Sequence, residues 1–210
     1  MTDLKTKGVI IEAVVAGLRP NRDRVRSRIT PQLQRYFDEP ILASSWYPFE
    51  DYAALTDLLA STVDRTFVPG DPYEFFGRAL AQRDIGGSQE RVPEKQRTAT
   101  AGVYRNTVLA GQGVAGQVRR VLGIRKHYFT ASSYEAKRTD DRTLRIRGVE
   151  FPVVSSSNCV SVTGFLDEAF SMLGLGHVRK LACTAAGAAE CVWELRLDAG
   201  VDPAELSAFE

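Results

Sequence analysis

Apolar residues in the first hundred positions recur at helical spacing. The clearest case is residues 46–63, where they alternate in steps of three and four and so form one buried stripe. Another helix is expected to begin at Asp71-Pro72, because a capping acid there precedes a proline. Residues 8–18 are apolar almost throughout, a pattern that fits a strand and a buried helix equally well. The first half of the chain is therefore predicted to be mainly helical, with a polar loop or short exposed helix over residues 88–100.

Beyond residue 100 the pattern changes to strands. We expect a hairpin of residues 127–137 and 143–151, in which the second strand alternates apolar and charged side chains. A helix that starts near Cys159 follows, and a second hairpin of residues 178–183 and 191–197 closes the chain. This order predicts an α+β fold, in which an N-terminal helical layer packs on a C-terminal antiparallel sheet built as hairpin, helix and hairpin.

The length of 210 residues predicts a single domain over residues 1–210. We divide it into a mainly helical part (1–100), an α+β part (101–200) and a tail (201–210). Basic and acidic residues nearly cancel, at 27 and 26, so we do not expect nucleic acid as a partner, because that requires a clustered basic face. The apolar run over residues 8–18 is too short to span a membrane and precedes no evident cleavage site, so we expect a cytoplasmic protein.

Three cysteines, Cys159, Cys183 and Cys191, lie in the last third of the chain. Cys183 and Cys191 each stand four residues from Gly187, so a hairpin that turns there would place their Cβ atoms about 4.5–5.5 Å apart. Cys159, on the core face of the preceding helix, could join them. Three converging thiolates suit a zinc ion, and the alternative is three small buried thiols that close a core. The odd number of cysteines argues against a disulfide framework.

Two further motifs bear on enzymatic chemistry. The segment from Gly111 to Gly116 matches the G-x-G-x-x-G pattern of dinucleotide-binding loops, and Glu135 follows at a suitable distance. Its flanks lack a fully buried strand and a βαβ unit, so we favour a helix whose glycines allow close packing. The two histidines, His127 and His177, have no serine or cysteine nucleophile near them in the sequence. We therefore expect a protein that is not an enzyme.

Aromatic side chains supply the expected ligand site. Most aromatic residues should serve the core, but helices laid over a small sheet can leave an apolar pocket with a tyrosine hydroxyl as its polar handle. We expect Tyr134, next to Glu135, to be this handle, and Tyr128 and Phe129 to line the same pocket.

Several segments of the C-terminal half resemble the 4-vinyl-reductase-type ligand-binding domain. They are residues 159–165 (CVSVTGF), 178–183 (VRKLAC), Gly187 and 191–193 (CVW). This domain is the sensor module of phenol-responsive bacterial transcription activators. Its relatives include haem-nitric-oxide-binding domains and the Bet3-type subunits of the TRAPP vesicle-tethering complex. The resemblance covers roughly residues 100–197.

The resemblance implies a helical layer on an antiparallel sheet, often in a dimer, with a site for a small apolar ligand. The pair Tyr134-Glu135 resembles the ligand-contacting position of the phenol sensors. The three cysteines match the sensors' zinc ligands. The fourth ligand in those proteins is an acid three residues before the middle cysteine, where this chain has Lys180, which cannot bind zinc while it is protonated. Glu135, Glu190 or a water molecule could take its place.

A second likeness covers most of the chain but implies no activity. Residues 44–49 (SSWYPF) resemble a myxobacterial paralogous family. The leading hypothesis is thus a sensing or regulatory module that binds a small apolar molecule and signals to a protein partner. The alternatives are a scaffold protein of the same fold with a filled interior and, more distantly, a nucleotide-dependent enzyme that uses Gly111 to Gly116. A cavity at Tyr134 would favour the sensor.

Overall fold

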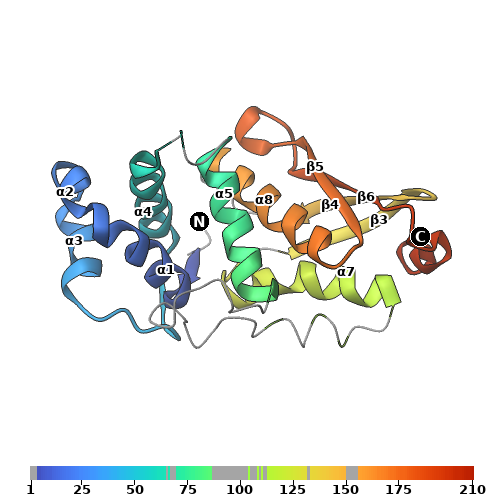
Figure 1. Ribbon diagram of the computed structural model, residues 1–210, viewed down its shortest axis with the longest axis horizontal. Helices are drawn as coiled ribbons and strands as arrows, with labels where there is room; N and C mark the ends of the chain where they lie inside the picture. Colours follow the sequence, from blue (N-terminus) through green and yellow to red (C-terminus); the bar gives the residue numbers. More distant parts are fainter. Residues whose placement is uncertain are drawn as a thin grey trace.

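The computed structural model describes residues 4–64, 66, 70–86, 104, 108, 110, 113–131, 133–149 and 156–210. The loop or helix expected over residues 88–100 lies outside these ranges, as do Gly111 and Gln112. The molecule is elongated, with the first helices of the chain at one end and a four-stranded sheet towards the other (Figure 1). Of the helices in the described ranges, none combines the length and the apolarity that a membrane crossing requires.

The N-terminal part is helical, as the sequence predicts. Its helices are α1 (Gly8–Leu18), α2 (Arg22–Val25), α3 (Pro31–Asp38) and α4 (Phe49–Thr62), and 3-10 turns at Arg19–Asn21 and Arg26–Arg28 flank α2. The ambiguous apolar run is thus the helix α1. Thr30 caps α3, because its side-chain oxygen accepts a hydrogen bond from the Leu33 N–H at 3.4 Å.

A short two-stranded sheet corrects the predicted start of α4. Strand β1 (Lys5–Lys7) pairs antiparallel with β2 (Trp46–Pro48), so residues 46–48 are extended and the helix begins only at Phe49. Pro48 lies at the end of this pairing, where its missing N–H costs no ladder hydrogen bond.

The same β1 strand also corrects the first predicted strand of the main sheet. The Lys7 N–H donates to the Tyr128 carbonyl oxygen at 2.8 Å, and Thr6 forms a bridge with Phe129. Residues 127–131 are therefore held against the N-terminus, after a 3-10 turn at Arg125–His127, and the sheet strand begins only at Ser133.

The main sheet has four antiparallel strands in the order β3-β4-β6-β5. They are β3 (Ser133–Asp140), β4 (Thr143–Val149), β5 (Gly176–Ala182) and β6 (Val192–Leu197). The two predicted hairpins are thus confirmed, and the second hairpin inserts its β6 strand next to β4. A 3-10 turn at Thr184–Ala186 and Gly187, with φ of +88°, connect β5 towards β6.

Three further helices complete the fold. They are α5 (Pro72–Ala81), which continues into a π-helical turn at Gln82–Gly86, α7 (Gly113–Ile124), and α8 (Ser156–Met172) between the hairpins. Asp71 caps α5 as predicted, since its Oδ1 accepts from the Tyr73 N–H at 2.8 Å. The Trp193 indole N–H on β6 donates to Thr163 Oγ1 on α8 at 2.9 Å, which ties this helix to the sheet.

Helices α5 and α8 cross in direct backbone contact (Figure 1). A Cβ atom at Gly77 would overlap the Ser161 carbonyl oxygen, and one at Gly164 would overlap the Glu74 carbonyl oxygen. Only glycine at both positions allows this approach. The crossing matters because it fixes the N-terminal half of α8, which carries part of the candidate site.

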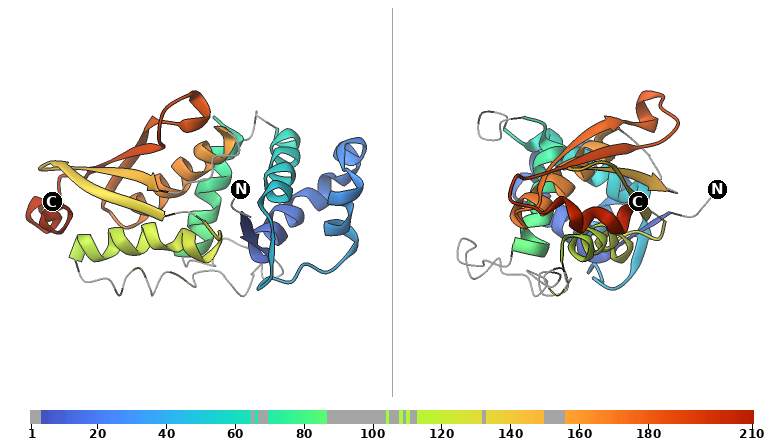
Figure 2. Two further views of the ribbon diagram at one scale, coloured as in Figure 1. Left: turned by 180° about the vertical axis from the view of Figure 1, so that it is seen from behind. Right: turned by 90° about the vertical axis from the view of Figure 1, so that its right-hand side faces the viewer.

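Residues 201–210, which the sequence analysis assigns to a tail, pack on the rest of the molecule. Pro203–Phe209 form a 3-10 helix that buries Leu206 and Phe209. Figure 2 shows this helix beside the N-terminal end of α7. The Glu205 carboxylate accepts a hydrogen bond from the Val114 N–H at 2.7 Å, so it occupies the N-terminus of α7.

Candidate functional site

A pocket lies where the helices meet the start of the main sheet. It is lined by Tyr52, Leu80, Val121, Ile124, Arg125, Tyr128, Phe129, Tyr134, Asn158, Ser161, Val162, Phe165 and Leu166. The three aromatic residues singled out in the sequence, Tyr128, Phe129 and Tyr134, all line this one pocket. Its cavity volume is about 30 Å³. A second, smaller pocket shares Tyr52 with the first and lies on the side of α4.

Tyr134 connects the pocket to the centre of the sheet. Its ring packs edge-on against Trp193, with ring centroids 5.8 Å apart. Burial raises the pKa of Tyr134 to about 12, so its hydroxyl keeps its proton at neutral pH. The neighbouring Glu135 lies on the opposite, wet face of the strand, where it pairs with Arg147 at 2.6 Å. Of Tyr134 and Glu135, only Tyr134 therefore offers a polar group to the pocket.

Arg125 and Tyr52 are pocket residues that the sequence analysis missed. Arg125 lies in the 3-10 turn at Arg125–His127, where the strand was expected to begin, and its guanidinium stacks over Phe129 with 4.2 Å to the ring centroid. Burial raises the pKa of Tyr52, and the positive charge of Arg125 opposes that rise. Tyr52 comes from α4, whose helical stripe predicts a core residue and gives no sign of a pocket.

Behind the pocket, Tyr128 is held by a buried ion pair. Its hydroxyl donates to Asp84 Oδ2 at 2.6 Å, and the Arg83 Nε donates to Asp84 Oδ1 at 2.8 Å. Asp84 is completely buried and lies in the π-helical turn after α5. Burial holds the pKa of the Asp84 carboxyl above its ordinary value, against the opposing effect of Arg83. This cluster fixes the ring of Tyr128 at the pocket wall.

The three cysteines converge, which confirms the geometry that the sequence predicts. Their sulfur atoms all lie within 4.8 Å of one another, and the Sγ atoms of Cys159 and Cys191 are 3.3 Å apart. Cys159 and Cys191 are buried, whereas Cys183 is half-buried. Burial raises the pKa of the Cys159 thiol to about 12. Burial also acts to raise the pKa of Cys183, but Cys159 and the Ala185 N–H outweigh it and lower that pKa.

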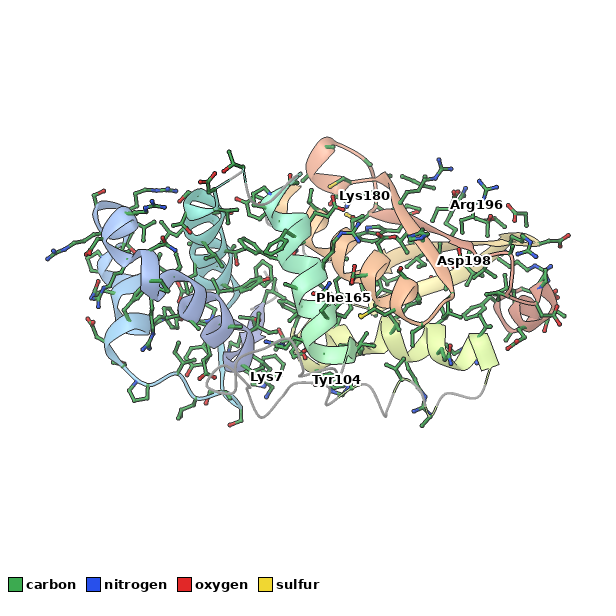
Figure 3. The ribbon with its side chains drawn as sticks, viewed as in Figure 1. Lys7, Tyr104, Phe165, Lys180, Arg196 and Asp198 are labelled. Atoms are coloured by element: carbon green, nitrogen blue, oxygen red, sulfur yellow. The ribbon has the colours of Figure 1, made fainter. Side chains whose placement is uncertain are left out.

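Lys180 stands beside these sulfurs, on β5 near the N-terminal end of α8 (Figure 3). Its Nζ is buried over the Trp193 ring, 4.4 Å from the centroid. Lys180 opposes the rise in the pKa of Cys159, first through a hydrogen bond to the Cys159 sulfur and then through its positive charge.

Three thiolates at this spacing could bind zinc, but no acid supplies the fourth ligand. No histidine or carboxylate within the described ranges joins the three sulfurs. Glu135 and Glu190, the two substitutes considered from the sequence, both pair with Arg147 instead. The sulfur geometry therefore fits a metal, and the cationic Lys180 beside it does not.

Comparison with known proteins identifies the fold. No protein-family model matches the chain, and no curated protein matches it either. Among solved structures, it is similar to an H-NOX protein from S. oneidensis in the Fe(II)NO ligation state, with a TM-score of 0.53 and 15% identity over 91% of this chain and 99% of the other. A variant of the Tt H-NOX protein gives a TM-score of 0.51 and 11% identity over 91% and 95%. The chain thus has an H-NOX-like α+β fold.

A haem group does not fit the pocket as it stands. A site for a ligand of drug size measures about 300–1,000 Å³, about ten times the 30 Å³ found here or more. Neither histidine lines the pocket. His127 is exposed and stacks on Tyr104 with 5.2 Å between ring centroids, and His177 lies 3.1 Å from Asp167 with most of its side chain in solvent.

Proposed function

We propose that the chain is a non-enzymatic sensing or regulatory module that binds a small apolar molecule in the pocket around Tyr134. The observation that carries this proposal is that Tyr128, Phe129 and Tyr134 meet helix residues around one cavity between the helices and the sheet. Apolar walls with a single tyrosine hydroxyl and one guanidinium suit a small, mostly apolar ligand with one polar group.

The size of the cavity limits the ligand. One water molecule needs about 10–15 Å³, so 30 Å³ holds about two water-sized groups. An apolar cavity that binds benzene measures about 150 Å³. A ring-sized ligand therefore requires a lining side chain to move, and Phe165 is the suitable one, because it is only half-buried (Figure 3).

The position of the pocket suggests how occupancy would be transmitted. Tyr52 comes from α4, Phe165 from α8 and Tyr134 from β3, so one ligand contacts elements that are far apart in the sequence. A shift of these elements relative to one another would change the surface offered to a protein partner or to a second copy of the chain. We propose that such protein contacts carry the signal.

The proposal predicts that Phe165→Ala binds a ring-sized probe more tightly than the natural protein does. Fluorobenzene followed by ¹⁹F NMR is a suitable probe, since removal of the Phe165 ring opens the space that a benzene ring needs. We expect the affinity to rise by about tenfold or more, equivalent to about 1.4 kcal/mol or more.

The matched control is Phe75→Ala on α5. Phe75 is 46% exposed and does not line the pocket, so this variant should bind fluorobenzene as the natural protein does. Equal affinities for the Phe165→Ala and Phe75→Ala variants would contradict the proposal. They would favour the scaffold alternative, in which side chains fill the interior.

The nucleotide-dependent alternative has weaker support. Gly113 begins α7, and the Val114 N–H at this helix end already binds the Glu205 carboxylate, where a phosphate would have to sit. Gly111 and Gln112, the start of the motif, lie outside the described residues. We therefore do not adopt this alternative.

The convergence of the three sulfurs also calls for a test of zinc binding. Because Lys180 stands where an acid would complete the site, we expect protein purified without chelator to contain less than about 0.2 equivalents of zinc. The Lys180→Glu variant supplies the missing carboxylate and should approach about one equivalent.

The control for the zinc experiment is Lys180→Gln, which removes the positive charge without adding a carboxylate. Elemental analysis of the natural protein and of the two Lys180 variants shows whether zinc binding requires the added carboxylate. One equivalent of zinc in the natural protein would show that the three cysteines suffice, and Lys180 would then not exclude the metal.

A further inference from the structure

The three cysteines and Lys180 form a thiol cluster with one accessible member. Cys183 is half-buried at the start of the turn between β5 and β6, whereas Cys159 and Cys191 are buried behind it. The Cys159 and Cys191 sulfurs are 3.3 Å apart, and all three sulfurs lie within 4.8 Å. A disulfide bond is about 2.05 Å long, so small side-chain movements would bring any two sulfurs to bonding distance.

We propose that this thiol cluster is an oxidation site, at which a hydroperoxide reacts with Cys183 and one disulfide forms within the cluster. The accessible sulfur of Cys183 receives the oxidant, and the buried sulfurs supply the partner thiol. A partly accessible cysteine beside a positive charge and a second thiol is the arrangement found in redox-sensitive sites.

The reaction balances in two steps. The Cys183 sulfur attacks one oxygen of the hydroperoxide ROOH, the O–O bond breaks, and a sulfenic acid and the alcohol ROH form. The Cys159 sulfur then attacks the sulfenic sulfur, the S–O bond breaks, and the hydroxide leaves with a thiol proton as water. Two thiols are oxidised to one disulfide, and the hydroperoxide takes up the two electrons.

The third cysteine gives the cluster a second stable arrangement. Cys191 lies next to Cys159, so its sulfur can attack the new disulfide and release Cys183 as a thiol. Either arrangement leaves one disulfide and one free thiol per chain. Both link α8 to the loop between β5 and β6, next to Trp193 and the pocket residue Tyr134.

The test is a thiol count on the full-length, metal-free protein before and after treatment with tert-butyl hydroperoxide. The natural protein has three free cysteines, and we expect two to be lost and then recovered with dithiothreitol. Mass spectrometry of the unreduced protein should show the loss of two hydrogens in single chains, with the disulfide mapped to two of the three cysteines. The count does not depend on ligand binding in the pocket, so it can fail or succeed independently of the proposed function.

The variant Cys183→Ser removes the accessible sulfur. We expect its thiols to react with the hydroperoxide at least about tenfold more slowly than those of the natural protein, because both remaining sulfurs are buried. Circular dichroism checks that this variant is folded. Three thiols retained after oxidation of the natural protein, a disulfide between two chains, or equal rates for the Cys183→Ser variant and the natural protein would each overturn the proposal.

Discussion

The Gly77→Ala variant is expected to lose about 3 kcal/mol of free energy of unfolding, at the upper end of the cost of overpacking. The added methyl group would overlap the carbonyl oxygen of Ser161, and neither backbone can move without separating α5 from α8. The ion pair between Arg78 and Asp167, 2.6 Å long, joins the same two helices and would be strained by such a movement. Urea unfolding followed by circular dichroism measures the loss.

The control for Gly77 is another glycine in a helix, Gly123 of α7. A Cβ atom there meets nothing within 4 Å, so Gly123→Ala should stabilise the protein by about 0.5 kcal/mol through the lower flexibility of the unfolded chain. If both variants gain stability, α5 and α8 do not cross in backbone contact. The placement of the pocket residues on α8 would then be wrong.

Removal of the buried carboxylate in Asp84→Ala is expected to cost about 3–5 kcal/mol, the usual penalty for leaving a buried charge without its partner. The Arg83 side chain is only 17% exposed and would lose its ion pair, while the Tyr128 hydroxyl would lose its acceptor. The Arg83 Nη2 already has no hydrogen-bond partner among the described residues, so little else can compensate. The midpoint of urea unfolding reports the change.

An exposed aspartate provides the comparison for Asp84. Asp141 pairs with Arg138 in the turn between β3 and β4, but its side chain is 89% exposed, so Asp141→Ala should change stability by less than about 0.5 kcal/mol. A similarly small effect of Asp84→Ala would mean that Tyr128 is not held by a buried ion pair.

Local signals in the sequence predicted most elements of the fold. Asp71 followed by Pro72 marked the start of α5, and the turn at Gly187 marked the second hairpin. Strand β1 has only three residues, too few to show alternation, and its partners lie about 40 and more than 120 positions away. Such pairing is decided by tertiary contacts that no local pattern records, which is why the start of β3 was misplaced.

The sequence pointed to the aromatic residues of the candidate site but not to its charged residues. Tyr128, Phe129 and Tyr134 were expected to line a pocket, because helices laid over a small sheet can leave an apolar space with a tyrosine hydroxyl as its polar group. Arg125 carries a charge, and a charged residue just before an expected strand gives no sign that it faces a pocket. Asp84 likewise becomes notable only when its burial is known.

The surroundings of the three cysteines could be predicted only in part from the sequence. The spacing around Gly187 predicted that the Cys183 and Cys191 sulfurs meet, since a hairpin places its flanking residues side by side, and Cys159 on the preceding helix could join them. What the sulfurs face was visible only in three dimensions: Lys180 lies over Trp193 beside the thiols, and Glu135 and Glu190 lie elsewhere. The sequence left a zinc site and three buried thiols open, and this arrangement weakens the zinc alternative.

The central claim is that the interior beside Tyr134 accepts a small apolar molecule. A crystal structure of the natural protein under xenon pressure tests it most directly, since xenon is apolar and marks cavities without requiring a hydrogen bond. The account predicts a xenon atom among Tyr134, Phe165 and Val121. Xenon bound elsewhere in the molecule, with side chains filling the space at Tyr134, would contradict it.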